Sequence, residues 1–346
     1  MALDEFKTLD TEPLIASEPA HPRDSSRLLV LERATGAIHH KIFREIGEFL
    51  KAGDLIVIND SKVFPARLLG NKPSGGKSEI LLVRQDAEPS LWYGLARDCR
   101  CGNTVLFEGG LKAEAISRNE QGELLFRFSG GDALSYAMEH GKIPLPHYIT
   151  KTRKRMHEAE QQNSDFENYQ TVFAQNTGSI AAPTAGLHFT PRLMTELKEH
   201  GVSFAEVTLH VGWGTFRPVK VDNPADHTML PEYATVKPEV AAVINKARAE
   251  GRRIVSVGTT STRTLETFTT PEGVTQSGSR WANTYIYPPY RFKGINALIT
   301  NFHLHDSTPL LLASAFAGQD KLFAAYKEAV ALKYRFYSYG DAMLIV

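Results

Sequence analysis

Three histidines in this sequence lie where side chains could do chemistry on a bound ligand. His188 closes a segment of small residues, His210 precedes a segment that contains two glycines, and His303 lies in a polar loop. Histidine gains and loses a proton near neutral pH, and small residues allow a ligand to approach the backbone closely. The pattern predicts general acid–base chemistry by these histidines, without showing which is the acid and which the base.

Another segment, Gly-Thr-Thr-Ser-Thr-Arg at residues 258–263, predicts an anion site. It precedes a helix expected from Leu265, and free N–H groups at a helix start favour a negative charge. The Arg263 guanidinium could hold a carboxylate through two parallel hydrogen bonds. The alternative is a helix with several capping hydroxyls and no ligand, in which Arg263 pairs with Glu266.

These side chains need strands that end at one edge of a sheet. Thr190 and Pro191 predict the start of a helix, and the β-branched residues of 202–211 predict a strand after it. Strand–loop–helix passages are also expected at residues 253–265 and 295–310. Because parallel strands joined by helices end on the same side, we expect an α/β main domain with these loops gathered at one edge.

Residues 68–128 follow a different pattern, with short strand-like pieces separated by turn residues. Regular short strands of this kind are typical of a small barrel or sandwich. The sequence therefore predicts an inserted, barrel-like all-β domain at residues 65–150. Residues 1–64 and 151–346 would form the discontinuous α/β catalytic domain.

The charge balance excludes a general attraction to nucleic acid. Lys and Arg total 39, Asp and Glu total 39, and the formal net charge of the 346 residues is zero. A nucleic-acid site must therefore be a local patch. The densest basic run predicts either a solvated mobile loop or a contact with phosphates, and its members are Lys151, Arg153, Lys154 and Arg155.

Other features bound the class of protein. Cys99 and Cys101 are expected to be reduced thiols, and the N-terminal residues show no signal peptide, so a cytoplasmic location is expected. The dinucleotide-binding, phosphate-loop, nucleophile-elbow and His-Glu-x-x-His motifs are all missing from the sequence. The residues alone thus indicate an α/β enzyme for a small, polar, partly anionic ligand.

Long strings of residues, spread over nearly the whole chain, indicate a particular protein family. They are Asn-Asp-Ser-Lys-Val-Phe-Pro-Ala-Arg at 59–67, Tyr-Gln-Thr-Val-Phe at 169–173, Ala-Ala-Pro-Thr-Ala-Gly-Leu-His-Phe at 181–189, Thr-Leu-His-Val-Gly at 208–212, Gly-Thr-Phe-Arg-Pro at 214–218, Val-Gly-Thr-Thr at 257–260, Thr-Asn-Phe-His-Leu at 300–304, and Tyr-Arg-Phe-Tyr-Ser-Tyr-Gly-Asp-Ala-Met at 334–343. In these strings the chain resembles the S-adenosylmethionine:tRNA ribosyltransferase-isomerase family of queuosine biosynthesis.

The resemblance implies a specific reaction. The ribosyl part of S-adenosylmethionine would be joined to 7-aminomethyl-7-deazaguanine at the wobble position of tRNA and isomerised, giving epoxyqueuosine with release of adenine and methionine. S-adenosylmethionine is then a consumed co-substrate, and no metal or other cofactor is expected. The resemblance also implies a cytoplasmic monomer, with tRNA as partner and no membrane contact.

This chemistry suggests uses for the candidate residues. A base would remove a proton beside the sulfonium and an acid would protonate the departing adenine, which suits His188, His210 and His303. Arginines suit the methionine carboxylate or a tRNA phosphate. The residues predicted to contact the substrate are Thr184, Gly186, Gly212, Gly214, Arg217, Glu232, Thr259, Thr260, Arg263 and Asn301.

Some positions depart from the family pattern. Leu230 and Pro231 stand where His and Ser are usual, and His305 and Asp306 stand where Pro and a polar or charged residue are usual. These departures leave open a non-catalytic relative that binds tRNA. The several histidines leave open a metal-dependent hydrolase.

Overall fold

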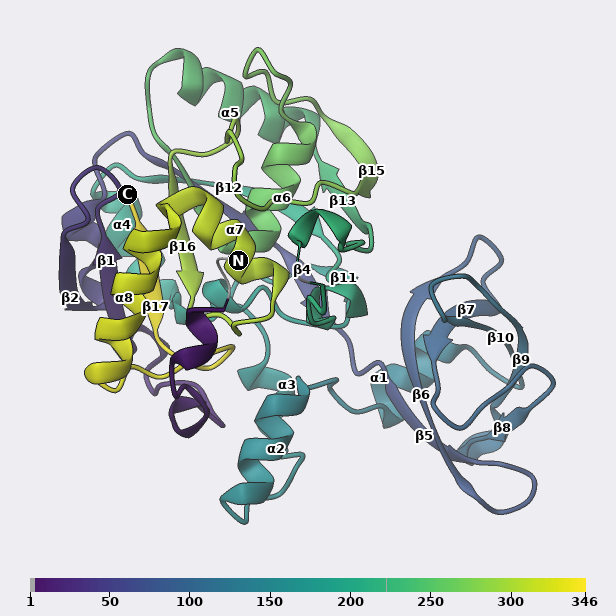
Figure 1. Ribbon diagram of the computed structural model, residues 1–346. Coiled ribbons are helices and arrows are strands. Elements are labelled where there is room, and N and C mark those ends of the chain that lie inside the picture. The colour runs from purple at the N-terminus through teal and green to yellow at the C-terminus, as the bar shows by residue number, and fades with distance from the viewer. Residues whose placement is uncertain (1–3, 222) are drawn as a thin grey trace.

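The computed structural model describes residues 4–221 and 223–346, and a nine-stranded sheet is its centre (Figure 1). Its strands in spatial order are β15 (Gly278–Ala282), β13 (Glu232–Val236), β12 (Ser203–Leu209), β3 (Leu55–Asn59), β14 (Ile254–Val257), β16 (Ala297–Asn301), β17 (Ala342–Ile345), β1 (Arg27–Leu31) and β2 (Ile38–Ile42). β12, β3, β14 and β16 run parallel to one another. Their carboxyl ends therefore lie at one edge of the sheet, as expected.

The alternation of side chains along β3 shows why helices cover both faces. Leu55 and Val57 belong to a core with the helices α5 (Pro238–Ala249), α6 (Gly258–Phe268), α7 (Thr308–Ala317) and α8 (Gln319–Ala331). Ile56 and Ile58 belong to a second core with η4 (Phe43–Phe49) and α4 (Pro191–Glu199). Successive side chains point to opposite faces of a strand, so an unbroken apolar run produces a sheet buried on both sides.

A closed barrel stands beside this main body, on the right in Figure 1. Its strands in spatial order are β10 (Leu124–Ser129), β7 (Leu91–Leu95), β6 (Lys77–Gln85), β5 (Arg67–Asn71), β8 (Thr104–Leu106) and β9 (Lys112–Arg118). The barrel has its own hydrophobic core, and α1 (Ala133–His140) follows it. The predicted fold class, an α/β domain with a small all-β barrel, is confirmed. The exact limits at 65 and 150 stay a prediction.

Two local expectations are wrong. The helix expected from Leu265 begins at Gly258, directly after β14, so the hydroxyl residues belong to α6 itself. The mobile loop that was one alternative for the basic run is instead the last turns of α2 (His147–Arg155), which precedes the short α3 (Asp165–Asn168).

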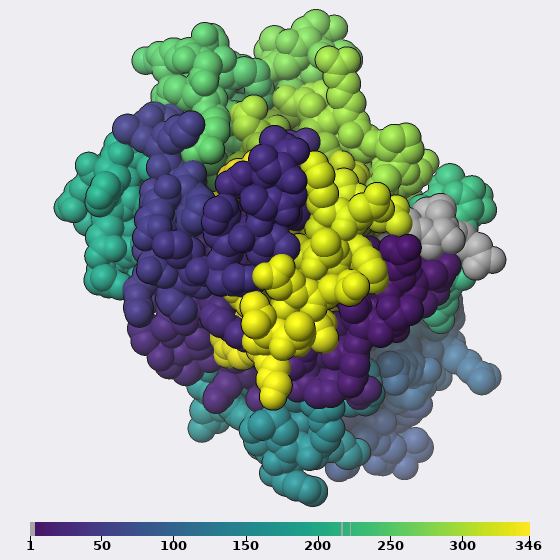
Figure 2. All heavy atoms as spheres, turned by 60° about the vertical axis from the view of Figure 1, so that its left-hand side comes forward, coloured from purple at the N-terminus to yellow at the C-terminus, as the bar shows by residue number. Residues whose placement is uncertain are grey.

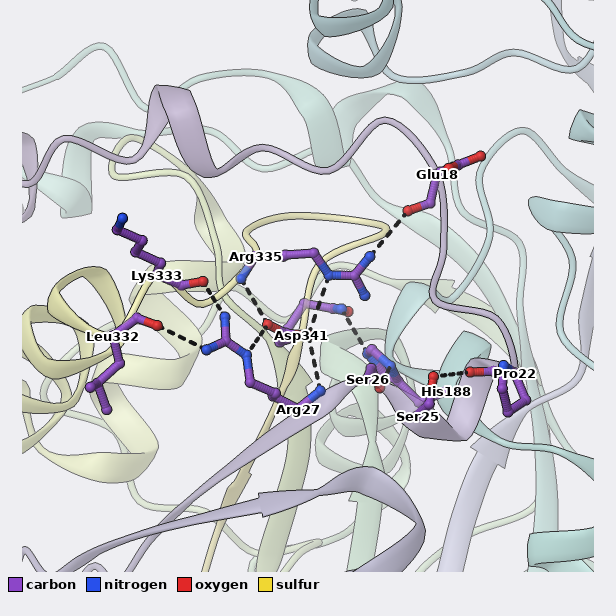
Figure 3. A network of polar contacts seen from close by, with 11 residues as sticks. Glu18, Pro22, Ser25, Ser26, Arg27, His188, Leu332, Lys333, Arg335 and Asp341 are labelled. Carbon is purple, nitrogen blue, oxygen red and sulfur yellow. Dashed lines mark hydrogen bonds and ion pairs between the residues drawn. The ribbon is translucent and has the colours of Figure 1, made fainter.

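The two ends of the chain pack side by side. β1 pairs in parallel with β17, and the purple N-terminal and yellow C-terminal parts adjoin on the surface (Figure 2). The Asp341 carboxylate supports this junction, because it accepts hydrogen bonds from the backbone N–H groups of Arg27, at 3.0 Å, and Arg335, at 2.8 Å (Figure 3). Cys99 and Cys101 are free, as expected. Within the described ranges, every helix is too short or too polar to cross a membrane.

Candidate active site

A cavity of about 450 Å³ lies at the carboxyl ends of the parallel strands. Three segments line it: residues 181–185, residues 258–260 after β14, and residues 300–307 at and after the end of β16. We call it the sheet-edge cavity. A volume of this size suits a small-molecule ligand, and the loops expected to gather at this edge do so.

A second cavity, of about 430 Å³, lies between the barrel and the main sheet, and we call it the barrel-facing cavity. Arg84, Trp92 and Glu123 line it from the barrel, and residues 210–214 and 230–233 line it from the main body. Val211, just after β12, lines both cavities. The two therefore meet at the end of β12.

The three candidate histidines are not brought together. His303 lines the sheet-edge cavity and His210 lines the barrel-facing cavity. His188 is 4% exposed and lies in the wall behind Asn301. The structure thus places the three candidates in different surroundings rather than around one space.

His303 is the histidine placed for proton transfer in the sheet-edge cavity. Its Nε2 lies 2.6 Å from the hydroxyl of Thr300, and its backbone N–H donates to the hydroxyl of Tyr326 at 2.7 Å. Burial lowers the pKa of His303 to about 3. The imidazole is therefore neutral at pH 7, and if it gains a proton it is a strong acid.

His188 holds other residues in place. Its Nδ1 lies 2.8 Å from the hydroxyl of Ser26, and its Nε2 lies 3.1 Å from the amide nitrogen of Asn301 (Figure 3 shows the Ser26 side). The amide oxygen of Asn301 accepts from the Thr184 hydroxyl at 2.9 Å. The Asn301 amide can only donate to Nε2, so His188 donates from Nδ1. The predicted catalytic contact by His188 is corrected: both nitrogens are used, and the ring positions Asn301 and Thr184.

The surroundings of His188 keep it uncharged. Burial lowers the pKa of His188 to about 4, although the Asp341 carboxylate acts in the opposite direction. A neutral ring is what the hydrogen bond from Asn301 requires, because a protonated ring has no acceptor nitrogen. The chain from Ser26 through His188 and Asn301 to Thr184 therefore gives one wall of the sheet-edge cavity a fixed arrangement.

His210 has free hydrogen-bonding capacity. Among the residues with a described structure, its Nδ1 has no partner although the atom is buried. Burial also lowers the pKa of His210. The ring packs on Gly178, where an added Cβ would lie only 2.9 Å from the imidazole. Gly178 has φ of +146°, so both the conformation and the close contact require glycine.

Protein groups occupy the side chain of Arg263, which favours a structural role over the predicted ligand contact. Its guanidinium pairs with the buried carboxylate of Glu232, and it donates to the carbonyls of Thr284 at 3.2 Å and Ala282 at 3.0 Å. Arg263 is 4% exposed. The alternative pairing with Glu266 is also wrong, because that carboxylate accepts from the backbone N–H of Gly294 at 2.7 Å. The side chain instead ties α6 to β13 and β15.

Glu232 likewise organises the loop between the cavities. One carboxylate oxygen accepts from the backbone N–H of Gly212 at 2.9 Å and from the hydroxyl of Thr215 at 2.7 Å. The other pairs with Arg263. Glu232 is 2% exposed. Glu232 therefore positions residues 212–215, and because it also lines the barrel-facing cavity, its contact with substrate stays a prediction.

The glycines predicted to contact substrate differ in their position relative to the cavities. Gly212 and Gly214 line the barrel-facing cavity, and an added Cβ on Gly214 would lie 2.7 Å from the side chain of Leu230. Leu230, one of the positions that depart from the family pattern, thus packs against Gly214. Gly186 lies outside both cavities, and an added Cβ there would lie 2.6 Å from the ring of Phe173. Gly186 is needed for packing.

The start of α6 is the place in the sheet-edge cavity for a negative charge. Thr259 and Thr260 line the cavity at the first turn of this helix. The Thr260 hydroxyl is buried and has no partner in the parts of the chain that the structure describes, and the residue is 7% exposed. Arg217 also lines the cavity, and its guanidinium lies 5.3 Å from the ring centre of Trp213. Free N–H groups, an unused hydroxyl and this cation all favour an anion.

The basic residues of α2 divide into two groups. Arg153 is 0% exposed and makes a bidentate pair with Asp165, at 2.9 and 2.7 Å, so its predicted tRNA contact is corrected to a structural role. Lys151, Lys154 and Arg155 are exposed. Lys151 and Arg155 share the carboxylate of Glu12. A surface of three lysine and arginine side chains remains.

Tyr148 and Ser338 line the sheet-edge cavity and were not predicted as site residues. Their hydroxyls lie 2.5 Å apart, and burial raises the pKa of Tyr148 to about 12. The string at residues 334–343 was a signal that could have identified Ser338. Tyr148 follows a proline-rich link and carries no such signal. Across the described chain, no three His, Cys, Asp or Glu side chains form a group that could hold a metal ion.

Comparisons with known proteins agree with this architecture. The relatives named S-adenosylmethionine:tRNA ribosyltransferase-isomerase include those of Desulfitobacterium hafniense, 45% identical over 354 residues, and Moorella thermoacetica, 47% identical over 353 residues; each match covers 100% of both chains. The crystal structure of S-adenosylmethionine tRNA ribosyltransferase from Thermotoga maritima is 38% identical, with a TM-score of 0.53 over 98% of both chains. The family described as queuosine biosynthesis protein matches residues 3–345. The chain therefore belongs to this queuosine biosynthesis family.

Proposed function

We propose that this protein is an S-adenosylmethionine:tRNA ribosyltransferase-isomerase. It transfers the ribosyl moiety of S-adenosylmethionine to 7-aminomethyl-7-deazaguanine at the wobble position of tRNA and isomerises it to epoxyqueuosine, releasing adenine and methionine. The full-length relatives with this name support the reaction. The observation that carries the assignment to a site is the sheet-edge cavity, where an anion site and a neutral histidine lie in one space.

S-adenosylmethionine fits the sheet-edge cavity by its chemistry. The methionine carboxylate would lie at the start of α6, where the N–H groups and the Thr260 hydroxyl can donate to it. Thr184 and Asn301 would contact the ribose or the amine, and their hydrogen bond to each other fixes their direction. Arg217 and Thr259 complete the contacts that we propose.

The reaction needs one proton to be removed and one to be supplied. The sulfonium acidifies the neighbouring ribose carbon, so a base can take that proton, and the adenine leaves more readily if it receives one. His303 is neutral at pH 7, so its ring has a lone pair that can accept the first proton, and the acidity that the sulfonium gives the ribose carbon must offset the weak basicity of a ring whose pKa is about 3. The same low pKa makes the imidazolium a strong acid, which then protonates adenine. We propose His303 for both transfers.

The direct test is turnover. The protein is incubated with S-adenosylmethionine and tRNA carrying 7-aminomethyl-7-deazaguanine, and the digested nucleosides are analysed by mass spectrometry. We expect epoxyqueuosine together with free adenine and methionine, in equal amounts. Binding of tRNA without any of these products would favour the non-catalytic relative.

We also propose that the reaction needs no metal or cofactor, and that the enzyme acts as a monomer in the cytoplasm. A parallel incubation in EDTA should give undiminished product, whereas activity that is lost and then restored by a divalent cation would favour metal-dependent chemistry. Light scattering during gel filtration should give the mass of one 38.4 kDa chain. A mass twice that value would disprove the monomer.

A further inference from the structure

The barrel-facing cavity is rich in aromatic side chains. Phe64 and Trp92 are buried in it, at 1% and 4% exposed, and Trp213 lies on its main-body side. The residues of its mouth, Tyr233 and Trp281, are 42% and 49% exposed. Flat apolar rings with edges open to water are suited to a planar, partly polar ligand such as a nucleobase.

The two aromatic residues at the mouth form a ledge on β13 and on its neighbour β15, the edge strand of the sheet. The rings of Tyr233 and Trp281 lie 5.4 Å apart at an angle of 69°. Across the cavity, the Arg84 guanidinium of the barrel lies 3.5 Å from the ring centre of Tyr93 and 5.9 Å from that of Trp281. Exposed aromatic rings beside an arginine plane are the groups on which unstacked bases of RNA loops stack.

Two polar groups inside the cavity have unused hydrogen-bonding capacity. The indole N–H of Trp92 is buried and has no partner among residues 4–221 and 223–346. The Glu123 carboxylate is 6% exposed and accepts from Trp213 and Asn119, each at 2.9 Å, and from Arg84 at 3.4 Å. A carboxylate has about four lone-pair sites, and the Arg84 contact is a long one. Glu123 can therefore accept further N–H groups.

These two groups offer the kinds of partner that the pairing edge of a guanine-type base needs. That edge has two adjacent N–H donors beside one carbonyl acceptor, and the residues lining the cavity supply a carboxylate acceptor, Glu123, and an unused N–H donor, Trp92. The 7-position lies on the neighbouring edge of the ring system, beside the carbonyl. A base whose pairing edge meets Glu123 therefore keeps its 7-substituent free of that contact. Val211 lines both cavities, so the sheet-edge cavity adjoins the place where such a base would lie.

We propose that the barrel-facing cavity binds the wobble base after it leaves the stack of the anticodon loop. Glu123 and Trp92 recognise its pairing edge, and the ledge of Tyr233 and Trp281 stacks an adjoining unpaired base. The aminomethyl group then faces the sheet-edge cavity past Val211. This inference rests on the proposed function, which supplies tRNA as the substrate.

The test measures binding without turnover. The probes are two anticodon stem–loops, with guanine or with hypoxanthine at the wobble position, because hypoxanthine lacks only the exocyclic amino group. We expect the wild type to prefer guanine about tenfold. Glu123→Gln should reduce this preference to nearly one, because an amide offers a single acceptor. Trp281→Ala should weaken binding of both probes about tenfold, which is typical of a lost base–aromatic stack.

Two controls make the result specific. Phe166→Ala removes an aromatic ring that is 45% exposed on α3 and lies outside both cavities, so it should bind both probes like the wild type. The affinity of every variant for S-adenosylmethionine should be unchanged, which shows that it is folded. An undiminished guanine preference in Glu123→Gln, or wild-type affinity in Trp281→Ala, would overturn the proposal. Because no turnover is measured, a wild type that makes no epoxyqueuosine would disprove only the proposed function.

Discussion

At the scale of single residues, His303 and His188 differ in what their ring nitrogens can still do. His303 faces the sheet-edge cavity, whereas both nitrogens of His188 are held by Ser26 and Asn301. Burial lowers the pKa of both imidazoles, so the charge state does not separate them. Access to the ligand separates them: His303 can transfer protons to or from a bound substrate, whereas His188 positions other residues.

The first prediction follows from this access. His303→Ala should lower kcat about 100-fold or more, because proton transfer by a side chain is typically worth 10²–10⁴-fold. The affinity for S-adenosylmethionine should stay within a factor of about three. Single-turnover kinetics and calorimetry measure the two effects. His200→Ala, at an exposed position after α4, is the matched control; a wild-type kcat for His303→Ala would remove His303 from the mechanism.

Arg263 leads to a prediction about stability. Arg263→Ala leaves the buried Glu232 carboxylate without its charged partner, which typically costs about 3–5 kcal/mol of the free energy of unfolding. Arg263→Lys should cost less, since it keeps the charge but loses the fork that reaches the Thr284 and Ala282 carbonyls. Urea unfolding measures both, with the exposed Arg291→Lys as control. A raised KM for S-adenosylmethionine with unchanged stability would restore the ligand role.

At the scale of elements, the start of α6 places an anion site directly at the end of strand β14. The helix begins without a connecting loop, so its first N–H groups lie directly at the sheet edge. Thr260 faces the sheet-edge cavity, whereas the next residue, Ser261, is fully buried and lies outside both cavities. Both hydroxyls are without a partner in the described structure. These neighbours therefore form a matched pair for mutation.

Thr260→Val should weaken binding of S-adenosylmethionine about tenfold, because it removes one donor while keeping the shape of the side chain. Ser261→Ala removes an equally unused hydroxyl and should leave that affinity unchanged. Calorimetric titration of both variants gives the comparison. Equal affinities would show that the start of α6 does not hold the substrate through this hydroxyl.

Helix α2 carries the prediction about tRNA. Replacing the exposed Lys151, Lys154 and Arg155 by Gln should weaken tRNA binding and flatten its dependence on salt, since fewer counterions are released. Glu12→Gln should strengthen tRNA binding, because it frees Lys151 and Arg155. Filter binding at several salt concentrations measures the slopes. Arg153→Gln should act on stability instead, and an unchanged slope in the triple variant would exclude α2 from the interface.

At the scale of the whole molecule, three histidines in different places are wholly or partly buried in neutral form. Burial lowers the pKa of His188 to about 4, that of His303 to about 3, and that of His210 as well. In the unfolded chain the same groups titrate near the ordinary histidine pKa of about 6.5. Between these values the unfolded chain binds protons that the folded protein does not. The stabilising effect of the neutral rings is therefore complete above about pH 6.5 and is lost as the pH falls toward about 4.

We thus expect the urea midpoint of unfolding to fall between pH 7 and pH 4.5. His188→Gln keeps a polar side chain without this titration, so its midpoint should be lower at pH 7 but should change less with pH. The midpoints of both proteins, measured across this range, check the sign. An equally steep pH dependence in His188→Gln would show that another group governs acid unfolding.

The sequence by itself determined the classes of element and the places of the loops. The β-branched residues of 202–211 indicated the strand β12, and short strands separated by turns indicated the barrel. Thr190 and Pro191 predicted the start of α4 because capping is local chemistry: the Thr190 hydroxyl accepts the N–H of Leu193 at 3.2 Å. The long strings of residues in the sequence also indicated the protein family. All of these features depend on neighbours in the chain.

Only the tertiary structure decided which side chains are available. Arg153 and Arg263 occur in segments that predict ligand contacts, yet partners on other elements of the fold, Asp165 and Glu232, occupy them. His188 and His210 have similar neighbours in sequence, yet one is closed by Ser26 and Asn301 and the other lines a cavity against the barrel. Burial and pairing depend on segments that are distant in the chain. No local pattern encodes which of these partners a side chain meets, because packing of the sheet, helices and barrel brings them together.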